Sequence, residues 1–171
     1  MKKLIFLLFL SAFSLEILSC DCKEYETRNE LLKDEIDNSD LIFTADYISN
    51  DGKSFHLKVK SIYKGTLITN QIIEGYIFDS YSKLINEKGE WLIYANIEKE
   101  NKININSCGL TRSRKKPSKN NNYRPPSPKL NSKQLKKFNS KRKKTALKDY
   151  KKEIDYLEKI ITPLENTKTI F

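Results

Sequence analysis

Two cysteines separated by a single residue, Cys20 and Cys22, are the most reactive feature of the sequence. A thiol can form a disulfide, bind a metal or accept a lipid, depending on its compartment. The third cysteine of the chain is Cys108. Three thiols allow one internal disulfide and leave one cysteine over. A bridge from Cys22 to Cys108 would close a long loop and stabilise the fold by about 4–5 kcal/mol in the chain-entropy model.

The beginning of the chain indicates the compartment. Met1-Lys2-Lys3 precedes an uncharged apolar run over residues 4–13. This run is too short to span a bilayer as a helix. A basic start before a short apolar stretch is typical of a secretory signal peptide; a buried N-terminal helix is the alternative. We therefore expect residues 1–19 to be a signal peptide, the protein to be exported, and a disulfide to form.

The cleavage site stays open between two positions. Cleavage after Ser14 would leave Leu15 first, and cleavage after Ser19 would leave Cys20 first. Residues 17–20, ILSC, loosely resemble a lipobox, the signal at which bacterial lipoproteins are acylated on their new N-terminal cysteine. Cys20 is therefore a lipidation candidate, and the mature protein would be extracellular, periplasmic or a membrane-anchored lipoprotein.

The remaining residue types form no recognisable catalytic or metal-binding pattern. His56 is the only histidine, and it lies on the polar side of a predicted strand, where we expect it to be solvated. One histidine and few cysteines do not supply a metal-ligand cluster, and no Ser-His-Asp or Cys-His arrangement is readable. We therefore predict a protein that is not an enzyme and has no cofactor or intrinsic metal.

The elements that would position these residues are mainly strands. A helix is predicted within residues 27–40, with Thr27 as a candidate cap and Asn38-Ser39-Asp40 as the residues that end it. Strands are predicted at residues 41–49, 54–65, 67–78, 90–95 and 102–107; the second alternates apolar and polar residues, and the fourth is nearly all apolar. Five strands joined by turns in about ninety residues favour a small closed barrel.

The net charge of +10 comes from one segment. Residues 20–111 contain 11 basic and 16 acidic residues, whereas residues 112–144 contain 14 basic and no acidic ones. The latter also hold four prolines and almost no apolar residues. Such a composition cannot bury enough surface to offset the entropy of ordering. We expect residues 112–144 to be a disordered basic linker. Its favoured role is that of a spacer, adhesion to anionic polymers or lipids comes second, and nucleic-acid binding is least favoured.

Residues 145–171 are predicted to form a C-terminal helix and tail. An amphipathic seam of apolar residues steps by three and four positions, and Thr162-Pro163 should end the helix. Packing of this helix back on the barrel is favoured over pairing with another chain. The seam consists of Leu147, Tyr150, Ile154, Leu157 and Ile161.

Several weak motifs occur in a familiar order. They read CDC at Cys20, then NSDLIFTADYIS, FHLKVKSIYKG, KGEWLIYA and KININSCGLTR. Together they resemble the tissue-inhibitor-of-metalloproteinases family within the netrin-like modules, most closely its bacterial exported members. The resemblance covers residues 20–112 and implies an OB-fold over residues 20–111, a five-stranded barrel with flanking helices.

The resemblance also implies roles for individual residues. Cys22 would pair with Cys108. The family's partner for Cys20 would fall at residues 78–84, where this sequence has no cysteine. The mature first cysteine of such inhibitors chelates the zinc of a protease through its α-amino nitrogen and carbonyl oxygen. Cys20 would be this chelating residue, and Asp21 would enter the pocket beside the zinc.

Two hypotheses follow for the function. In the first, the protein is an exported protein-binding module whose partner is a zinc metalloprotease inhibited through Cys20. In the second, it is a cell-envelope lipoprotein acylated at Cys20, held to the membrane by lipid and the basic segment, with a structural or adhesive role and no protease target.

Overall fold

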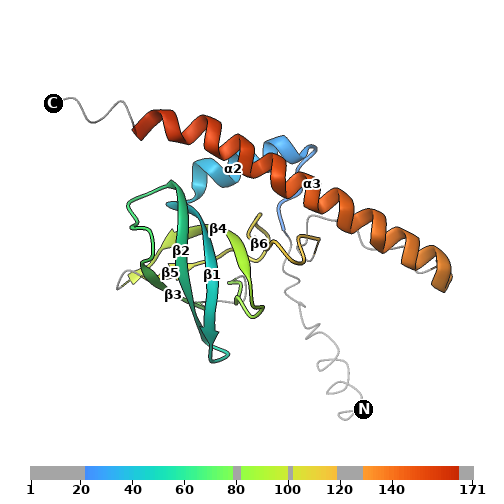
Figure 1. The fold of residues 1–171 in the computed structure, drawn as a ribbon, viewed down its shortest axis with the longest axis horizontal. Coiled ribbons are helices and arrows are strands. Elements are labelled where there is room, and N and C mark those ends of the chain that lie inside the picture. Colours follow the sequence, from blue (N-terminus) through green and yellow to red (C-terminus); the bar gives the residue numbers. More distant parts are fainter. Residues whose placement is uncertain (1–21, 79–81, 100–101, 119–128, 166–171) are drawn as a thin grey trace, which may run out of the picture.

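The computed structural model is a closed five-stranded mixed β-barrel with one extra strand and two helices (Figure 1). It describes residues 22–78, 82–99, 102–118 and 129–165, and for residues 161–165 the backbone alone. The predicted signal peptide, residues 1–19, lies outside the described residues. Among the described residues, no helix is both long and apolar enough to cross a bilayer.

The first helix of the described chain, α2, spans Arg28–Asn38. The predicted cap is confirmed, because the Thr27 side chain accepts a hydrogen bond from the Glu30 backbone N–H. Glu30 in turn accepts one from the Thr27 backbone N–H, which completes a capping box. This reciprocal pair satisfies two backbone donors that the helix itself leaves unpaired. The helix therefore begins where the sequence predicted.

The barrel strands follow the order β1-β2-β3-β5-β4 and close through pairing of β1 with β4. The β3–β5 pair is parallel, and the other pairs are antiparallel. The extra strand, β6, pairs with the beginning of β4. The bounds are β1 Leu41–Asn50, β2 Ser54–Lys64, β3 Ile72–Tyr76, β4 Glu90–Ile97, β5 Ile103–Asn104 and β6 Arg112–Ser113.

Two of the predicted strands are shorter than expected. The strand predicted at residues 67–78 is reduced to β3, because a tight turn precedes it. In this turn Asn70 has a positive φ of 69° and donates its backbone N–H to Val59. The strand predicted at residues 102–107 is reduced to β5 and an isolated bridge between Ser82 and Asn106.

The barrel interior and the surface under the helices form two separate apolar clusters. Neighbouring residues of a strand point to opposite faces, so β4 sends Trp91 and Ile93 into the barrel and Leu92 and Tyr94 toward the helices. This double burial explains why residues 90–95 are nearly all apolar. Phe55, deep in the barrel, packs so closely over its strand partner Gly75 that an added Cβ there would lie 2.0 Å from the ring.

The second helix, α3, spans Ser132–Glu165 and packs on the barrel, as predicted, on the same side as α2 (Figure 1). Its buried residues are Ala146, Tyr150, Glu153 and Leu157. The predicted seam is therefore correct at Tyr150 and Leu157 and at the half-buried Ile154, whereas Leu147 is exposed. The helix continues past Pro163, and the side chain of Ile161 lies outside the described residues.

The prediction of a disordered linker at residues 112–144 is wrong at both ends, and residues 119–128 lie outside the described residues. At the first end, Arg112 and Ser113 form β6 and are buried. At the other end, α3 begins at Ser132 after a reciprocal cap in which Asn131 and Gln134 bond each other's backbone N–H. Residues 132–144 contain no proline or glycine, and lysine is a good helix former, so charge alone did not prevent a helix.

A buried ion pair connects α3 to the barrel. The guanidinium of Arg112 donates to both carboxylate oxygens of Glu153, over 2.7 and 3.0 Å. Glu153 also accepts from the Tyr94 hydroxyl, over 3.0 Å, and from Arg28 of α2, over 2.8 Å. Only 1% of the Arg112 side chain and 2% of the Glu153 side chain are exposed. Burial, followed by the nearby negative charge of Glu153, raises the pKa of Tyr94 well above its usual range.

Replacement of Glu153 by glutamine should destabilise the fold strongly. The substitution leaves the Arg112 guanidinium buried without its counter-charge, which costs about 3–5 kcal/mol when one partner of a buried pair is removed. Urea unfolding followed by circular dichroism would measure the change. Glu158→Gln is the matched control, because Glu158 is exposed on the same helix and should change the free energy of unfolding by less than about 0.5 kcal/mol. Equal stability of the two variants would contradict the role of the pair.

Candidate functional site

A disulfide fastens the N-terminal segment to one end of the barrel. Cys22 is bonded to Cys108, with Cα atoms 5.5 Å apart and a separation of 86 positions in sequence. This separation is within the range in which disulfides form. The bridge is the one that the family resemblance implies. We call Cys22, Cys108 and the residues that support them, Glu35 and Lys83, the anchor site.

Cys108 lies in a tight turn that follows β5. The Asn106 side chain accepts the backbone N–H of Cys108 over 2.9 Å, and the Asn106 carbonyl accepts that of Gly109 over 3.2 Å. An Asn side chain that bonds the backbone two residues later is a common way to form such a turn. The turn and the disulfide together fix the direction of Cys108.

Helix α2 supports this turn through Glu35. The Glu35 carboxylate accepts the backbone N–H of Leu110 over 3.1 Å. It lies so close to Gly109 that a Cβ there would be 2.6 Å from a carboxylate oxygen, so only glycine fits without a shift. Burial raises the pKa of the Glu35 carboxyl, and the bond from Leu110 opposes that shift.

Lys83 supports the same end of the barrel from the loop before β4. Its ammonium donates to the Thr111 carbonyl over 2.7 Å, and its backbone N–H donates to Ile105. Burial, followed by the nearby positive charge of Arg112, lowers the pKa of Lys83 to about 8, while the charge of Glu35 acts in the opposite direction. A largely buried carboxyl and a largely buried amine therefore lie beneath the disulfide end.

The residues that follow Cys22 are held against α2. Asp34 accepts a 3.0 Å bond from the Lys23 ammonium and a 2.5 Å bond from the Tyr25 hydroxyl. These two donors, Tyr25 first, lower the pKa of Asp34. The chain is thus fixed by contacts at Lys23 and Tyr25 as well as by the disulfide, and the residues before Cys22 start from a defined point.

The residues expected to contact a partner are placed only in part. Cys20, the candidate for both zinc chelation and lipidation, lies outside the described residues. Asp21, the candidate pocket residue, lies outside them as well. Cys22 and Cys108 are brought together. His56 lies on the outer face of β2, half-buried, 3.4 Å from the Ser49 hydroxyl and 3.9 Å from the Glu74 carboxylate. Over the described ranges, no group of three or more potential metal ligands occurs.

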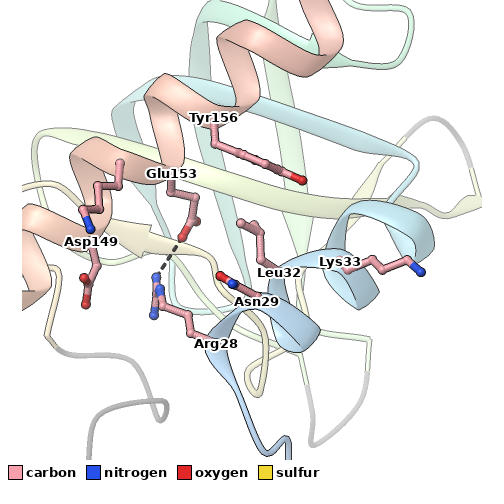
Figure 2. A pocket seen from close by; sticks show the side chains of 8 residues that line it. Arg28, Asn29, Leu32, Lys33, Asp149, Glu153 and Tyr156 are labelled. Atoms are coloured by element: carbon pink, nitrogen blue, oxygen red, sulfur yellow. Dashed lines mark hydrogen bonds and ion pairs between the residues drawn. The ribbon is translucent and has the colours of Figure 1, made fainter.

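A groove of about 600 Å³ lies between α2 and α3 (Figure 2). Arg28 of α2 and Glu153 of α3 form an ion pair there over 2.8 Å. Leu32 and Tyr156 provide apolar surface, one from each helix. The groove is therefore a junction between two helices that an ion pair holds together.

Sequence reasoning missed Glu35, Lys83, Arg112 and Glu153. A signal existed for Glu153, which stands three residues after Tyr150 and four before Leu157, at a position of the apolar seam. A carboxylate at such a position would be buried and would therefore need a cationic partner. Glu35 stands at a comparable position, four residues after Leu31, but its backbone partner 75 positions away cannot be identified from the sequence. Nothing comparable marks Lys83.

No protein-family model matches the sequence, and no curated protein matches it. The similarity to the tissue inhibitors therefore rests on the order of the short motifs alone.

Opening the disulfide should cost several kcal/mol of stability. The chain-entropy model gives about 4–5 kcal/mol for a loop of this length. We expect Cys22→Ser to lower the free energy of unfolding by that order, and reduction of the wild type with a thiol to have the same effect. Cys20→Ser is the control and should leave stability unchanged. If Cys20→Ser were as destabilising as Cys22→Ser, the assigned pairing would be wrong.

Lys83 should make stability rise with pH in the alkaline range. The folded state releases the Lys83 proton near pH 8 and the unfolded state near its ordinary value of 10.5. Between these values the unfolded state binds more protons, so the free energy of unfolding increases with pH. Tyr94 and Tyr150, whose pKa values are raised, act only above about pH 10.

Urea unfolding of wild type and Lys83→Met at intervals from pH 8 to pH 10 would test this. The variant should lack the upward slope that Lys83 contributes, whereas Lys88→Met, which removes an exposed lysine from the same loop, should keep it. Parallel pH profiles for wild type and Lys83→Met would show that Lys83 keeps an ordinary pKa.

Proposed function

We propose that this chain is an exported protein-binding module built on an OB-fold, and that it contacts its partner through the residues just before Cys22. The strand order, with β1 closing on β4 and a parallel β3–β5 pair among antiparallel pairs, supports the OB-fold. The observation that carries the proposal is the Cys22–Cys108 bridge. A contact segment that leaves a rigid body at a fixed point loses less conformational entropy when it binds.

In this proposal the partner is a zinc metalloprotease. A mature chain that begins at Cys20 offers an α-amino nitrogen and a carbonyl oxygen on adjacent atoms, a pair that can occupy the zinc positions otherwise held by catalytic water. The zinc belongs to the protease. Asp21 then points into the neighbouring pocket, and its carboxylate selects a protease whose pocket provides a cation or hydrogen-bond donors, because burial of an unpaired charge is costly.

A second candidate function is that of a cell-envelope lipoprotein with a structural or adhesive role. The observation that favours it is the cysteine count: the chain has three cysteines, and the bridge uses Cys22 and Cys108. The Cys20 thiol then carries a diacylglycerol, and acylation of its amine removes zinc chelation. In this case the barrel has no protease target.

Mass spectrometry of the mature protein separates the two candidates. The precursor would be produced in a bacterium that has both signal peptidases, purified from the envelope and the medium, and digested for its N-terminal peptide. An unmodified Cys20 start supports the inhibitor, and diacylglycerol on Cys20 supports the lipoprotein. A Leu15 start removes both mechanisms.

The inhibitor proposal predicts that one added residue abolishes activity. The mature form beginning at Cys20, with its disulfide formed, should inhibit at least one member of a panel of zinc metalloproteases. The same protein with an alanine before Cys20 should lose at least about 100-fold in inhibition, since the chelating amine becomes an amide. Cys20→Ser, which keeps the amine and carbonyl, is the matched control and should retain most of the inhibition. Equal inhibition by the alanine-extended form would refute zinc chelation.

A further inference from the structure

Helix α3 carries a continuous row of lysines on one face. Six lysines follow one another at intervals of three or four residues and a seventh comes directly after the sixth, which places all seven within about 100° of one another around the helix axis. The row covers about 28 Å at 1.5 Å per residue. All seven side chains are exposed, and we call them the lysine stripe: Lys133, Lys137, Lys141, Lys144, Lys148, Lys151 and Lys152.

The stripe lies on the side of α3 that faces away from the barrel. The residues that α3 buries, Ala146, Tyr150, Glu153 and Leu157, centre about 170° around the helix from the stripe. The Arg112–Glu153 pair fixes this rotation of the helix, because Glu153 must face the barrel. The N-terminal part of α3 reaches past the barrel, so that much of the stripe stands clear of it (Figure 1).

Helix stability does not explain this arrangement. Lysines near the N-terminus of a helix oppose its dipole, and the first turn of α3 has no acidic residue. Like charges four residues apart, such as Lys133–Lys137 and Lys144–Lys148, destabilise a helix further. The nearest acidic residue on the helix within the stripe's length, Asp149, lies toward the buried side and is half-buried. The stripe therefore concentrates positive charge at some cost to the helix that carries it.

The chemistry of the stripe favours a flat anionic surface over nucleic acid. Lysines are point charges that suit lipid headgroups, whereas recognition of bases relies on bidentate arginines and stacking aromatics. The one arginine of α3, Arg142, is half-buried and donates to the Ser118 carbonyl.

A straight row opposite the barrel lets the lysines from Lys133 to Lys148 approach one plane without a clash. Lys151 and Lys152 lie at the two edges of the stripe, where they line grooves against β2 and α2. The apolar residues of α3 that pack on the barrel, Tyr150, Ile154 and Leu157, face away from the stripe, so the contact of the stripe with a bilayer is electrostatic.

We propose that the lysine stripe is a docking surface for bilayers that contain anionic lipids. The inference concerns a surface separate from the anchor site and does not depend on zinc chelation. If Cys20 is acylated, the stripe supplies the second of the two signals that stable membrane attachment requires. If Cys20 is not acylated, the stripe gives weak and salt-sensitive attachment by itself.

Vesicle sedimentation with the mature, unacylated protein beginning at Cys20 tests this proposal. Phosphatidylcholine vesicles with one third phosphatidylglycerol should bind the protein at physiological ionic strength, and pure phosphatidylcholine vesicles should not. A variant with Lys137, Lys141, Lys144 and Lys148 changed to glutamine should lower the partition coefficient by about 100-fold or more. Glutamine has nearly the helix propensity of lysine, and circular dichroism would verify that α3 remains folded.

The matched control removes the same charge elsewhere. Lys53, Lys58, Lys88 and Lys99 are exposed on the barrel and its loops, and their change to glutamine should lower vesicle binding less than about tenfold. Equal losses for the two variants would show that net charge alone is responsible and would overturn the proposal. Stripe-dependent binding of duplex DNA in preference to the vesicles at the same ionic strength, or no binding of anionic vesicles, would overturn it as well.

Discussion

The carboxylate of Glu153 determines how helix α3 packs against the barrel. It enters the contact between α3 and the barrel, where an unpaired charge would be costly. It is tolerated because Arg112, Arg28 and Tyr94 all reach it. These three groups come from β6, α2 and β4, so the pairing is complete only when all three elements and α3 are in place. A rotation of α3 by one residue would replace the carboxylate by a neighbouring side chain and lose every one of these bonds.

Helix α2 links this contact to the disulfide end of the molecule. Arg28 at its first position bonds Glu153, while Glu35 two turns later supports the backbone beside Cys108. The capping box and the buried Leu31 hold the helix between these points. The position of Cys22 and the position of α3 are therefore not independent, because both are set through the same eleven-residue helix. Helix α2 therefore contributes both to the fixed position of Cys22 and to the outward direction of the lysine stripe.

Much of the architecture could be predicted from periodicity and turn chemistry. The period of two in β2, the apolar run in β4 and the Thr27 cap all identify their elements, because these signals are local. The structure of the basic segment could not be predicted in this way. Its composition indicated too little apolar surface to bury, whereas Arg112 is buried because it pairs with Glu153, 41 residues further along the chain. The ends of β3 and β5 depend on the turn at Asn70 and on the bridge from Ser82, which are tertiary effects. For the candidate site, the cysteines were readable from the chain, but the buried support by Glu35 and Lys83 was not.

The disulfide also determines how the protein would respond to mechanical tension. A chain held near its N-terminus and pulled through α3 transmits the force from Cys22 across the sulfur–sulfur bond to Cys108, and then through β6 to the helix. The strands β1 to β5 belong to the covalent ring between these two cysteines and lie outside that route. Tension would separate α3 and β6 from the molecule first, while the barrel, shielded by the ring, would keep its strand pairing. A tethered form of this protein could therefore extend under shear and recover without unfolding the barrel.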